Sequence, residues 1–242
     1  MTRGEQRRST TAWRAMILAA VTATAGCAAM GIRGDDAYKP AINPADFSSN
    51  VDNPYYPLVP GTTLKYVETA LGKTSENEIT TTNDIKTVMG VKCRVVHDVA
   101  MEDGKIVEDT YDWLAQHKDG TVWYFGEDTK EYKPGGMVST VGSWEAGVNG
   151  AQPGILMPGN PKPGEPYRQE YGRSVAEDMG QIVALGEKVT VPAGTYTDTV
   201  KTKDWSLLES GSENKWYARG VGVVKETTTD GEVATLVAIV RP

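Results

Sequence analysis

The sequence predicts an all-β protein built on one antiparallel, strongly curved sheet or half-barrel, made of hairpins and carrying a long Gly/Pro-rich loop. Three observations support this class. The aromatic residues are 11 Tyr and 6 Trp but only 2 Phe, and 26 Gly with 13 Pro supply many turns; this mixture favours strands. Runs of alternating apolar and polar residues recur along the chain. Three X-Asp-Gly loops connect such runs, as is typical of tight hairpins.

Residues 91–101 and 105–117 form the clearest predicted hairpin, because apolar residues occupy most odd positions in both runs. The connecting "EDG" fits a three-residue loop that ends in a left-handed glycine. This loop sets the following cross-strand pairs: Val99 with Val107, Val95 with Tyr111, Cys93 with Trp113 and His97 with Asp109. The apolar residues then share one face, and we expect the acidic residues on the other face to contact water.

The other two loops extend the same sheet. "KDG" (118–120) pairs Trp113 with Phe125 and Ala115 with Trp123, and "TDG" (229–231) aligns Val223 with Val237 and Val221 with Ile239. We therefore predict a twisted meander that the C-terminal hairpin closes. The candidate apolar ligand face on the concave side consists of Tyr111, Trp113, Trp123 and Phe125. The alternative is that these side chains fill the core and leave no cavity.

His97 and Asp109 form a candidate polar pair, since the predicted register places them opposite each other. A carboxylate beside an imidazole orients the ring, which is half of a catalytic arrangement. A nucleophile is missing: the sequence has no G-x-S-x-G elbow, and Cys93 lies four residues from His97 in the same strand. We predict a structural pair and a buried, inert Cys93, and no catalytic residue. An envelope hydrolase using His97 with acidic residues is the enzymatic alternative.

Asp98 and Glu108 face each other on the polar side of the predicted hairpin. Like charges across a ladder are unfavourable, so a lysine, solvent or a divalent cation must neutralise them. No D-x-D-x-D-G calcium loop is present, and we expect a solvated acidic face. These two residues are weak metal candidates, and a calcium-stabilised adhesion module is the corresponding alternative. No P-loop or dinucleotide-binding motif appears, and no cofactor is predicted.

The N-terminus has the layout of a signal peptide over residues 1–26, with four arginines before an apolar stretch that ends in small residues. The following "TAGC" resembles the lipobox of bacterial lipoproteins, although Thr24 stands where that family usually has an aliphatic residue. The resemblance implies cleavage before Cys27 and lipid attachment to Cys27. It also implies an extracytoplasmic location on a bacterial membrane, the outer membrane if there is one, because Ala28 and not Asp follows the cysteine.

We expect residues 27–52 to be a lipid-anchored flexible tether and residues 53–242 to be a single β domain. The segments "NPYYPLVPGTTLKYVET", "VPAGTYTDTVKTKDW" and "WYARGVGVVKE" resemble an uncharacterised family of secreted β-rich proteins. That resemblance implies a curved half-barrel and no assigned activity. Residues 147–166 contain many Gly and Pro and no strand pattern, so this loop is either a lid over the barrel or a packed crossover.

The charge of the chain limits its partners. Its formal net charge is −7, and residues 27–242 hold 21 basic and 31 acidic residues. Phosphate contacts need clustered Lys and Arg, so nucleic acid is excluded as a partner. The sequence therefore predicts a cell-envelope lipoprotein that binds a ligand or acts as a scaffold. Its expected partners are the membrane, through Cys27, and an apolar small molecule or another envelope protein.

Overall fold

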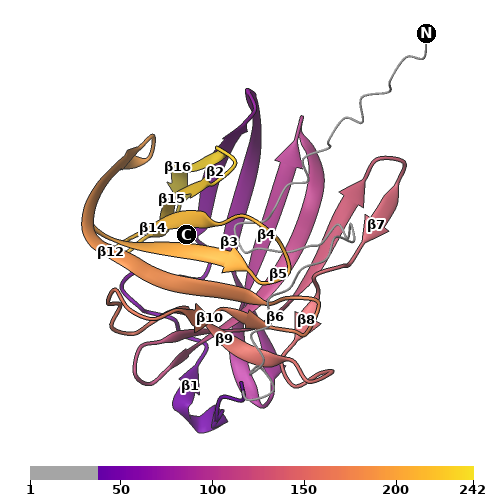
Figure 1. Cartoon of the computed structure of the whole chain (residues 1–242), viewed down its shortest axis with the longest axis vertical. Coiled ribbons are helices and arrows are strands. Elements are labelled where there is room, and N and C mark those ends of the chain that lie inside the picture. Colours follow the sequence, from indigo (N-terminus) through magenta and orange to yellow (C-terminus); the bar gives the residue numbers. More distant parts are fainter. Residues whose placement is uncertain (1–37) are drawn as a thin grey trace.

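The computed structural model describes residues 38–242. These residues form one antiparallel sheet that curls into a nearly closed barrel (Figure 1), so the predicted all-β class and the predicted curved sheet are confirmed. The predicted signal peptide, Cys27 and the first part of the predicted tether lie outside the described residues. Within residues 38–242, no helix has both the length and the apolar character needed to cross a membrane.

The chain begins its regular structure with a short 3₁₀ helix, η2 (Pro44–Asp46). The strands of the first half are β1 (Phe47–Ser48), β2 (Thr63–Ala70), β3 (Lys73–Val88), β4 (Val91–Glu102), β5 (Lys105–His117), β6 (Val122–Lys133), β7 (Met137–Ser139) and β8 (Trp144–Glu145). Those of the second half are β9 (Gln152–Met157), β10 (Tyr167–Arg168), β11 (Glu170–Tyr171), β12 (Asp178–Val191), β13 (Gly194–Ser206), β14 (Glu213–Ala218), β15 (Gly222–Thr228) and β16 (Val233–Val240).

Most neighbours in the barrel are consecutive strands of the chain. The order around the sheet is β10, β12, β13, β14, β15, β16, β2, β3, β4, β5, β6, β9 and β11, while β1 pairs with β5, and β7 and β8 pair with β6. Because β16 pairs with β2, the C-terminal hairpin joins the last strands to the first long strand, in the middle of the strand order and not at its closing edges. Two meanders therefore meet at this junction.

A five-residue stretch joins the two ends of the sheet. We call residues 167–171 the closing segment: its first half, β10, pairs with β12, and its second half, β11, pairs with β9. Between them, the backbone N–H of Gln169 donates a hydrogen bond of 2.8 Å to the carbonyl of Asp178. Gly154 in β9 lies so close that a β-carbon built on it would be 2.2 Å from the Gln169 carbonyl oxygen. The backbone of β9 therefore lies directly against the backbone of the closing segment, with no side chain between them at Gly154.

The predicted register of the hairpin at "EDG" is wrong by two residues. The turn has two residues, Asp103 and Gly104, and both have positive φ angles of 49° and 71°. This geometry suits a tight hairpin turn. A bulge at Val107 then absorbs the extra residue. As a result, the cross-strand pairs are Val99 with Asp109, Val95 with Trp113 and His97 with Tyr111. The shift of two preserves which residues share a face.

The other two loops give the predicted registers next to the turn. Ala115 faces Trp123 as predicted, but a bulge next to Asp112 interrupts the ladder before Trp113 and Phe125 can pair. At the C-terminal hairpin, Lys225 faces Thr235 and the next two pairs follow the predicted alignment. Loop chemistry therefore fixes register near each turn, and bulges change it further away.

Both faces of the sheet are buried around β5. Trp113, Leu114 and Ala115 are consecutive, so they point to alternate faces, yet each is at most 6% exposed. The outer face is covered by residues that the sequence analysis assigned to the tether. β1 pairs with β5, and Phe47 packs edge-on against Phe125 at a centroid distance of 5.5 Å. The ordered domain therefore begins before residue 53, because Phe47 and Val51 bury apolar surface on it.

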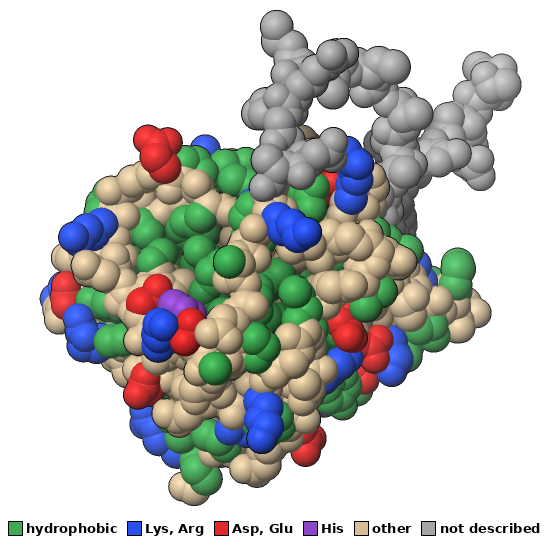
Figure 2. Space-filling model, turned by 90° about the horizontal axis from the view of Figure 1, so that it is seen from below, with side chains coloured by type: hydrophobic (Ala, Val, Ile, Leu, Met, Phe, Trp, Pro, Cys, Tyr) green, Lys and Arg blue, Asp and Glu red, His purple; other side chains and the backbone are tan. Residues whose placement is uncertain are grey.

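The end of the barrel at which β1 lies is covered by protein. Figure 2 views this end and shows hydrophobic side chains spread over it, with charged side chains scattered among them. Residues 147–166 also contribute here, and they contain a strand, β9, that their sequence pattern does not indicate. β9 pairs with β6, and it buries Leu156 and Met157. The Gly/Pro-rich loop is the remainder, from residue 158 to residue 166.

Candidate functional site

The inner face of the barrel carries buried carboxyl groups from most of its strands. On β5, Glu108 and Asp112 point inward and are at most 2% exposed. Lys215 on β14 interacts electrostatically with Asp98 on β4 and Glu170 on β11, so these strands face one another across the interior. The carboxyl groups that we call the interior acid cluster are each at most 6% exposed: Asp98, Glu108, Asp112, Glu127, Glu170, Asp178, Asp204 and Glu213.

The expectation that Asp98 and Glu108 lie on a solvated face is therefore wrong. The alternation along β4 and β5 correctly predicts which residues share a face of the sheet. The face that carries the acids, however, points into the barrel and not toward solvent. The N-terminal segment covers the opposite face at the end of β5, where β1 pairs with Gln116 and His117, whereas His97 and Asp109 on that face stay partly exposed. Asp98 faces Thr110, and Glu108 faces Ala100, so the two carboxyls are not directly paired.

Burial changes the protonation of these two carboxyl groups. It raises the pKa of Glu108 to about 8, and the nearby Asp98 carboxyl adds to the rise. Burial also raises the pKa of Asp98 to about 6, even though Asn77 donates a hydrogen bond of 2.5 Å to its Oδ1 atom. Because its pKa is about 8, Glu108 is mostly a neutral acid at neutral pH. Within residues 38–242, no three His, Cys, Asp or Glu side chains are arranged to hold a metal ion.

A phenol links two further carboxyls of the interior acid cluster. The Tyr124 hydroxyl lies 2.6 Å from Oδ1 of Asp112 and 3.0 Å from Oε2 of Glu127. A phenol has one proton, so it donates to only one of the two oxygens. The other contact is a hydrogen bond only when that carboxyl carries a proton and donates to the phenol. Burial, with the charge of Asp98, raises the pKa of Asp112 well above the usual range, and burial with the charge of Asp112 does the same for Glu127.

Lys215 is a buried cation within the interior acid cluster. Its Nζ atom lies 2.8 Å from Glu213 Oε1, 3.6 Å from Asp204 Oδ2 and 4.0 Å from Glu226 Oε2. Burial lowers the pKa of Lys215, but the surrounding carboxylates more than offset this and raise it well above the usual range. Burial raises the pKa of Asp204 to about 6 despite the nearby ammonium group. One cation compensates only part of the carboxyl charge that full ionisation would create.

His97 and Asp109 lie on the outer face, away from the interior acid cluster. His97 Nε2 is 2.6 Å from Asp109 Oδ1, although the two residues are diagonal and not opposite neighbours. The imidazole stacks on the ring of Tyr111 with centroids 4.3 Å apart. Cys93 is fully buried on the same strand, and burial raises the pKa of its thiol to about 12. The predicted burial of Cys93 is confirmed, and the raised pKa disfavours the thiolate that a nucleophile would need.

A structural role for the His97–Asp109 pair predicts a measurable coupling. We expect His97→Gln and Asp109→Asn each to lower the free energy of unfolding by roughly 1 kcal/mol, because each removes one hydrogen bond of a half-buried pair. The double variant should lose less than the sum of the two. Urea unfolding of all four proteins measures this coupling. Fully additive losses would show that the contact contributes nothing.

The four aromatic residues proposed as a concave ligand face do not line the interior. Tyr111, Trp113, Trp123 and Phe125 share the outer face, because they alternate with the inward-facing acids and with Tyr124. Phe47 covers Phe125 and also packs edge-on against Trp123, with ring centroids 6.2 Å apart. The alternative, in which these side chains serve as core, therefore describes Trp113 and Phe125, and Tyr111 and Trp123 are partly buried against that core.

Trp113 also contributes to a cleft on the outer surface, which we call the outer cleft. It has a volume of about 360 Å³. Lys86 on β3 places its Nζ atom 3.2 Å from the centroid of the Trp113 ring and 2.8 Å from Glu145 Oε2. The lining residues are Lys86, Trp113, Glu127, Asp128, Ser143, Trp144, Glu145, Val148, Asn149, Ala151, Gly172, Arg173 and Val175. Aromatic rings, aliphatic side chains and both signs of charge thus meet in one recess of ligand size.

Comparisons with known proteins give a resemblance of fold only. No model of a known protein family matches the chain, and no curated protein sequence is similar to it. A crystal structure from Bacteroides fragilis, named as an exported protein with a YmcC-like fold, has a TM-score of 0.47 and 16% identity, covering 77% of this chain and 99% of the other. A lipoprotein structure from Parabacteroides distasonis has a TM-score of 0.42 and 15% identity, covering 77% and 98%. At such low scores, neither similarity assigns a function to this chain.

Proposed function

We propose that this protein is a cell-envelope lipoprotein whose β domain binds a small molecule in the outer cleft. The observation that carries the proposal is the cleft itself, a recess of about 360 Å³ with Trp113 and Trp144 in its wall. Pockets of this size accommodate small ligands, and a few polar groups among apolar ones set the orientation of the ligand. The expected ligand therefore combines an apolar body with a charged or hydroxyl group.

The membrane part of the proposal rests on the sequence "TAGC" and on the arginine-rich, apolar stretch before it. Lipid on Cys27 would hold the domain at the membrane surface, because each buried CH₂ group contributes roughly 0.8 kcal/mol. The location would then be extracytoplasmic, on the outer membrane if the organism has one. Anchoring and ligand binding are separate claims, and each has its own test.

Replacing Cys27 tests the anchor. We expect Cys27→Ala to move the protein from the membrane fraction to the soluble fraction, and mass spectrometry of the unmodified protein to find a lipid-sized mass increase on the peptide that begins at Cys27. Cys93→Ala is the matched control, since Cys93 is the other cysteine of the chain and should leave the anchor intact. A membrane-bound Cys27→Ala protein would contradict lipid anchoring.

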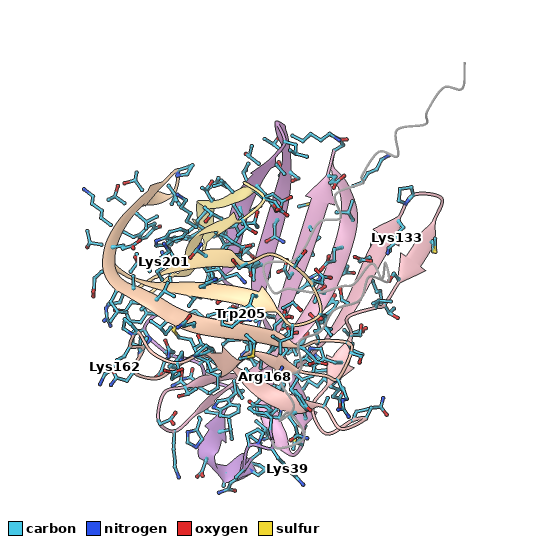
Figure 3. The ribbon with its side chains drawn as sticks, in the orientation of Figure 1. Lys39, Lys133, Lys162, Arg168, Lys201 and Trp205 are labelled. Atoms are coloured by element: carbon cyan, nitrogen blue, oxygen red, sulfur yellow. The ribbon has the colours of Figure 1, made fainter. Side chains whose placement is uncertain are left out.

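Native mass spectrometry of the protein purified from envelopes tests the ligand. We expect a small molecule to co-purify with the unmodified protein, and Trp113→Ala to lose most of it because this change removes the aromatic wall beneath Lys86. Trp205→Ala is the control: Trp205 belongs to β13 and does not line the outer cleft (Figure 3). If Trp113→Ala and Trp205→Ala retained the small molecule equally, binding in the outer cleft would be contradicted.

A hydrolase is the second candidate, and its supporting observation is the contact between His97 and Asp109. Turnover separates the two functions. An enzyme would lose activity on its substrate in His97→Gln while the melting temperature stayed unchanged, whereas a structural pair loses stability. A calcium-stabilised module would instead lose melting temperature when a chelator is added.

A further inference from the structure

The closing segment forms the shortest ladders around the barrel. It forms two residue pairs with β12 and two with β9, whereas β3 and β4 form ten pairs along their length. Backbone hydrogen bonds and side-chain contacts grow with the number of pairs, so a short connection opens at a lower free energy than a long ladder. Residues 167–171 are therefore the part of the sheet that can detach while the remaining strands stay together.

Glu170 is the acidic residue within this segment, and it points into the interior acid cluster. Its side chain is 1% exposed, and its Oε2 atom has no hydrogen-bond partner among the described residues. The groups that interact with it electrostatically come from each neighbouring part of the barrel: Asp112 on β5, Glu127 on β6, Asp178 on β12 and Lys215 on β14. Its neighbours on β9, Gln152 and Pro153, carry no charge.

A small cavity lies directly behind the closing segment. It has a volume of about 40 Å³, and Gln169, Glu170, Asp178, Glu213 and Lys215 contribute polar groups to its wall. Lys215 is already 2.8 Å from Glu213, so its charge is shared with carboxyls other than Glu170. An ionised Glu170 would meet three nearby acids in a region that water does not reach freely, which is costly for a carboxylate.

We propose that the closing segment is a pH-sensitive latch, which stays seated while Glu170 is protonated and detaches from β9 and β12 when Glu170 loses its proton. Detachment would open the interior acid cluster and the 40 Å³ cavity to solvent. Burial, with the charges of Asp178, Glu127 and Asp112, raises the pKa of Glu170 well above its usual range. A group with a raised pKa in the seated state favours that state at low pH and loses this contribution as the pH rises.

Hydrogen exchange measured from pH 5 to pH 9 tests the latch. The reporter is the amide of Gln169, which donates to the Asp178 carbonyl, and rates are corrected for the intrinsic pH dependence of exchange. We expect the corrected rate at Gln169 to rise about tenfold per pH unit once Glu170 begins to ionise, as one coupled proton requires. The β13 amides of residues 199–202 should lose protection only as far as the global free energy of unfolding falls, so Gln169 should exchange faster than they do once Glu170 ionises.

Two variants complete the experiment. Glu170→Gln removes the charge and keeps the size, so its exchange at Gln169 should stay slow up to pH 9. Glu165→Gln, an exposed change five residues earlier, should behave like the unmodified protein. Constant protection of Gln169 in the unmodified protein overturns the latch even if Glu170→Gln does not fold. A loss of protection in β13 as large as that at Gln169 overturns it too, since the whole barrel then unfolds together.

Discussion

The stability of this protein should fall as the pH rises from 5 to 8. Burial raises the pKa of Asp98 to about 6 and that of Glu108 to about 8, so the folded protein holds protons that the unfolded chain releases. Such groups stabilise the fold fully below their unfolded pKa values, and their contribution is lost as the pH passes the folded values. One pKa unit corresponds to about 1.4 kcal/mol, so Glu108 alone contributes on the order of 5 kcal/mol. Urea unfolding at each pH measures the change.

Glu108→Gln isolates this effect. The amide keeps the size of the side chain and cannot ionise, so we expect it to flatten the decline between pH 6 and 8 and to make the protein more stable than the unmodified form at pH 8. At pH 5, where Glu108 is protonated, the two proteins should differ little. Glu76→Gln is the control, because Glu76 is exposed on β3 and should leave the slope unchanged. Stability that rises from pH 5 to 8 would contradict the predicted burial of these acids.

The second large effect is expected from Gly154→Ala. The new β-carbon would lie 2.2 Å from the carbonyl oxygen of Gln169 and 2.8 Å from the backbone nitrogen of Glu170. Both atoms are backbone, so neither can rotate away, and β9 must separate from the closing segment. Overpacking in a rigid site typically costs about 1–3 kcal/mol, and we expect the upper end of this range or more, measured by urea unfolding.

Gly164→Ala is the matched control for Gly154→Ala. It adds the same methyl group to a loop residue of the same Gly/Pro-rich region, where the nearest atom is the Lys162 carbonyl oxygen at 3.7 Å, an ordinary contact. We expect its free energy of unfolding to stay within about 0.5 kcal/mol of the unmodified value. If the two alanine variants were equally stable, the close approach of β9 to the closing segment would be wrong.

The strands could be predicted from the sequence where alternation is regular and a short loop follows. Residues 91–101 and 105–117 form β4 and β5, and the "TDG" hairpin has the predicted alignment. The register at "EDG" could not be predicted in this way, since the choice between a three-residue loop and a two-residue turn with a bulge depends on packing far from the turn. Val107 absorbs the difference, and no residue type marks it.

The placement of the acids was the main failure of the sequence-based prediction, and its cause is physical. A period of two separates the faces of a strand but does not state which face is inside a closed barrel. The signal was present: acids and threonines alternate at Glu108, Thr110 and Asp112, and again at Glu127, Thr129 and Glu131. Threonine is a β-branched residue that tolerates burial next to carboxyls, and Thr110 and Thr129 are hydrogen-bonded to each other inside the barrel.

The outer cleft could not be predicted because its parts are distant in the sequence. Lys86 and Glu145 are 59 residues apart, and Trp113 reaches them from a third strand. The closing segment gave no signal either, since each of its strands has two residues and shows no alternation. Local patterns predict strands and turns, whereas sites assembled from several strands require the fold.

Carboxyl carbon chemical shifts, followed by NMR as a function of pH, test most directly whether the barrel encloses neutral acids. For Glu108 we predict a titration midpoint near pH 8, and for Asp98 one near pH 6, as the pKa values raised by burial require. Midpoints near 4.5 and 3.8, the values that these groups have when exposed to water, would mean that the acids contact solvent and that the described interior is wrong.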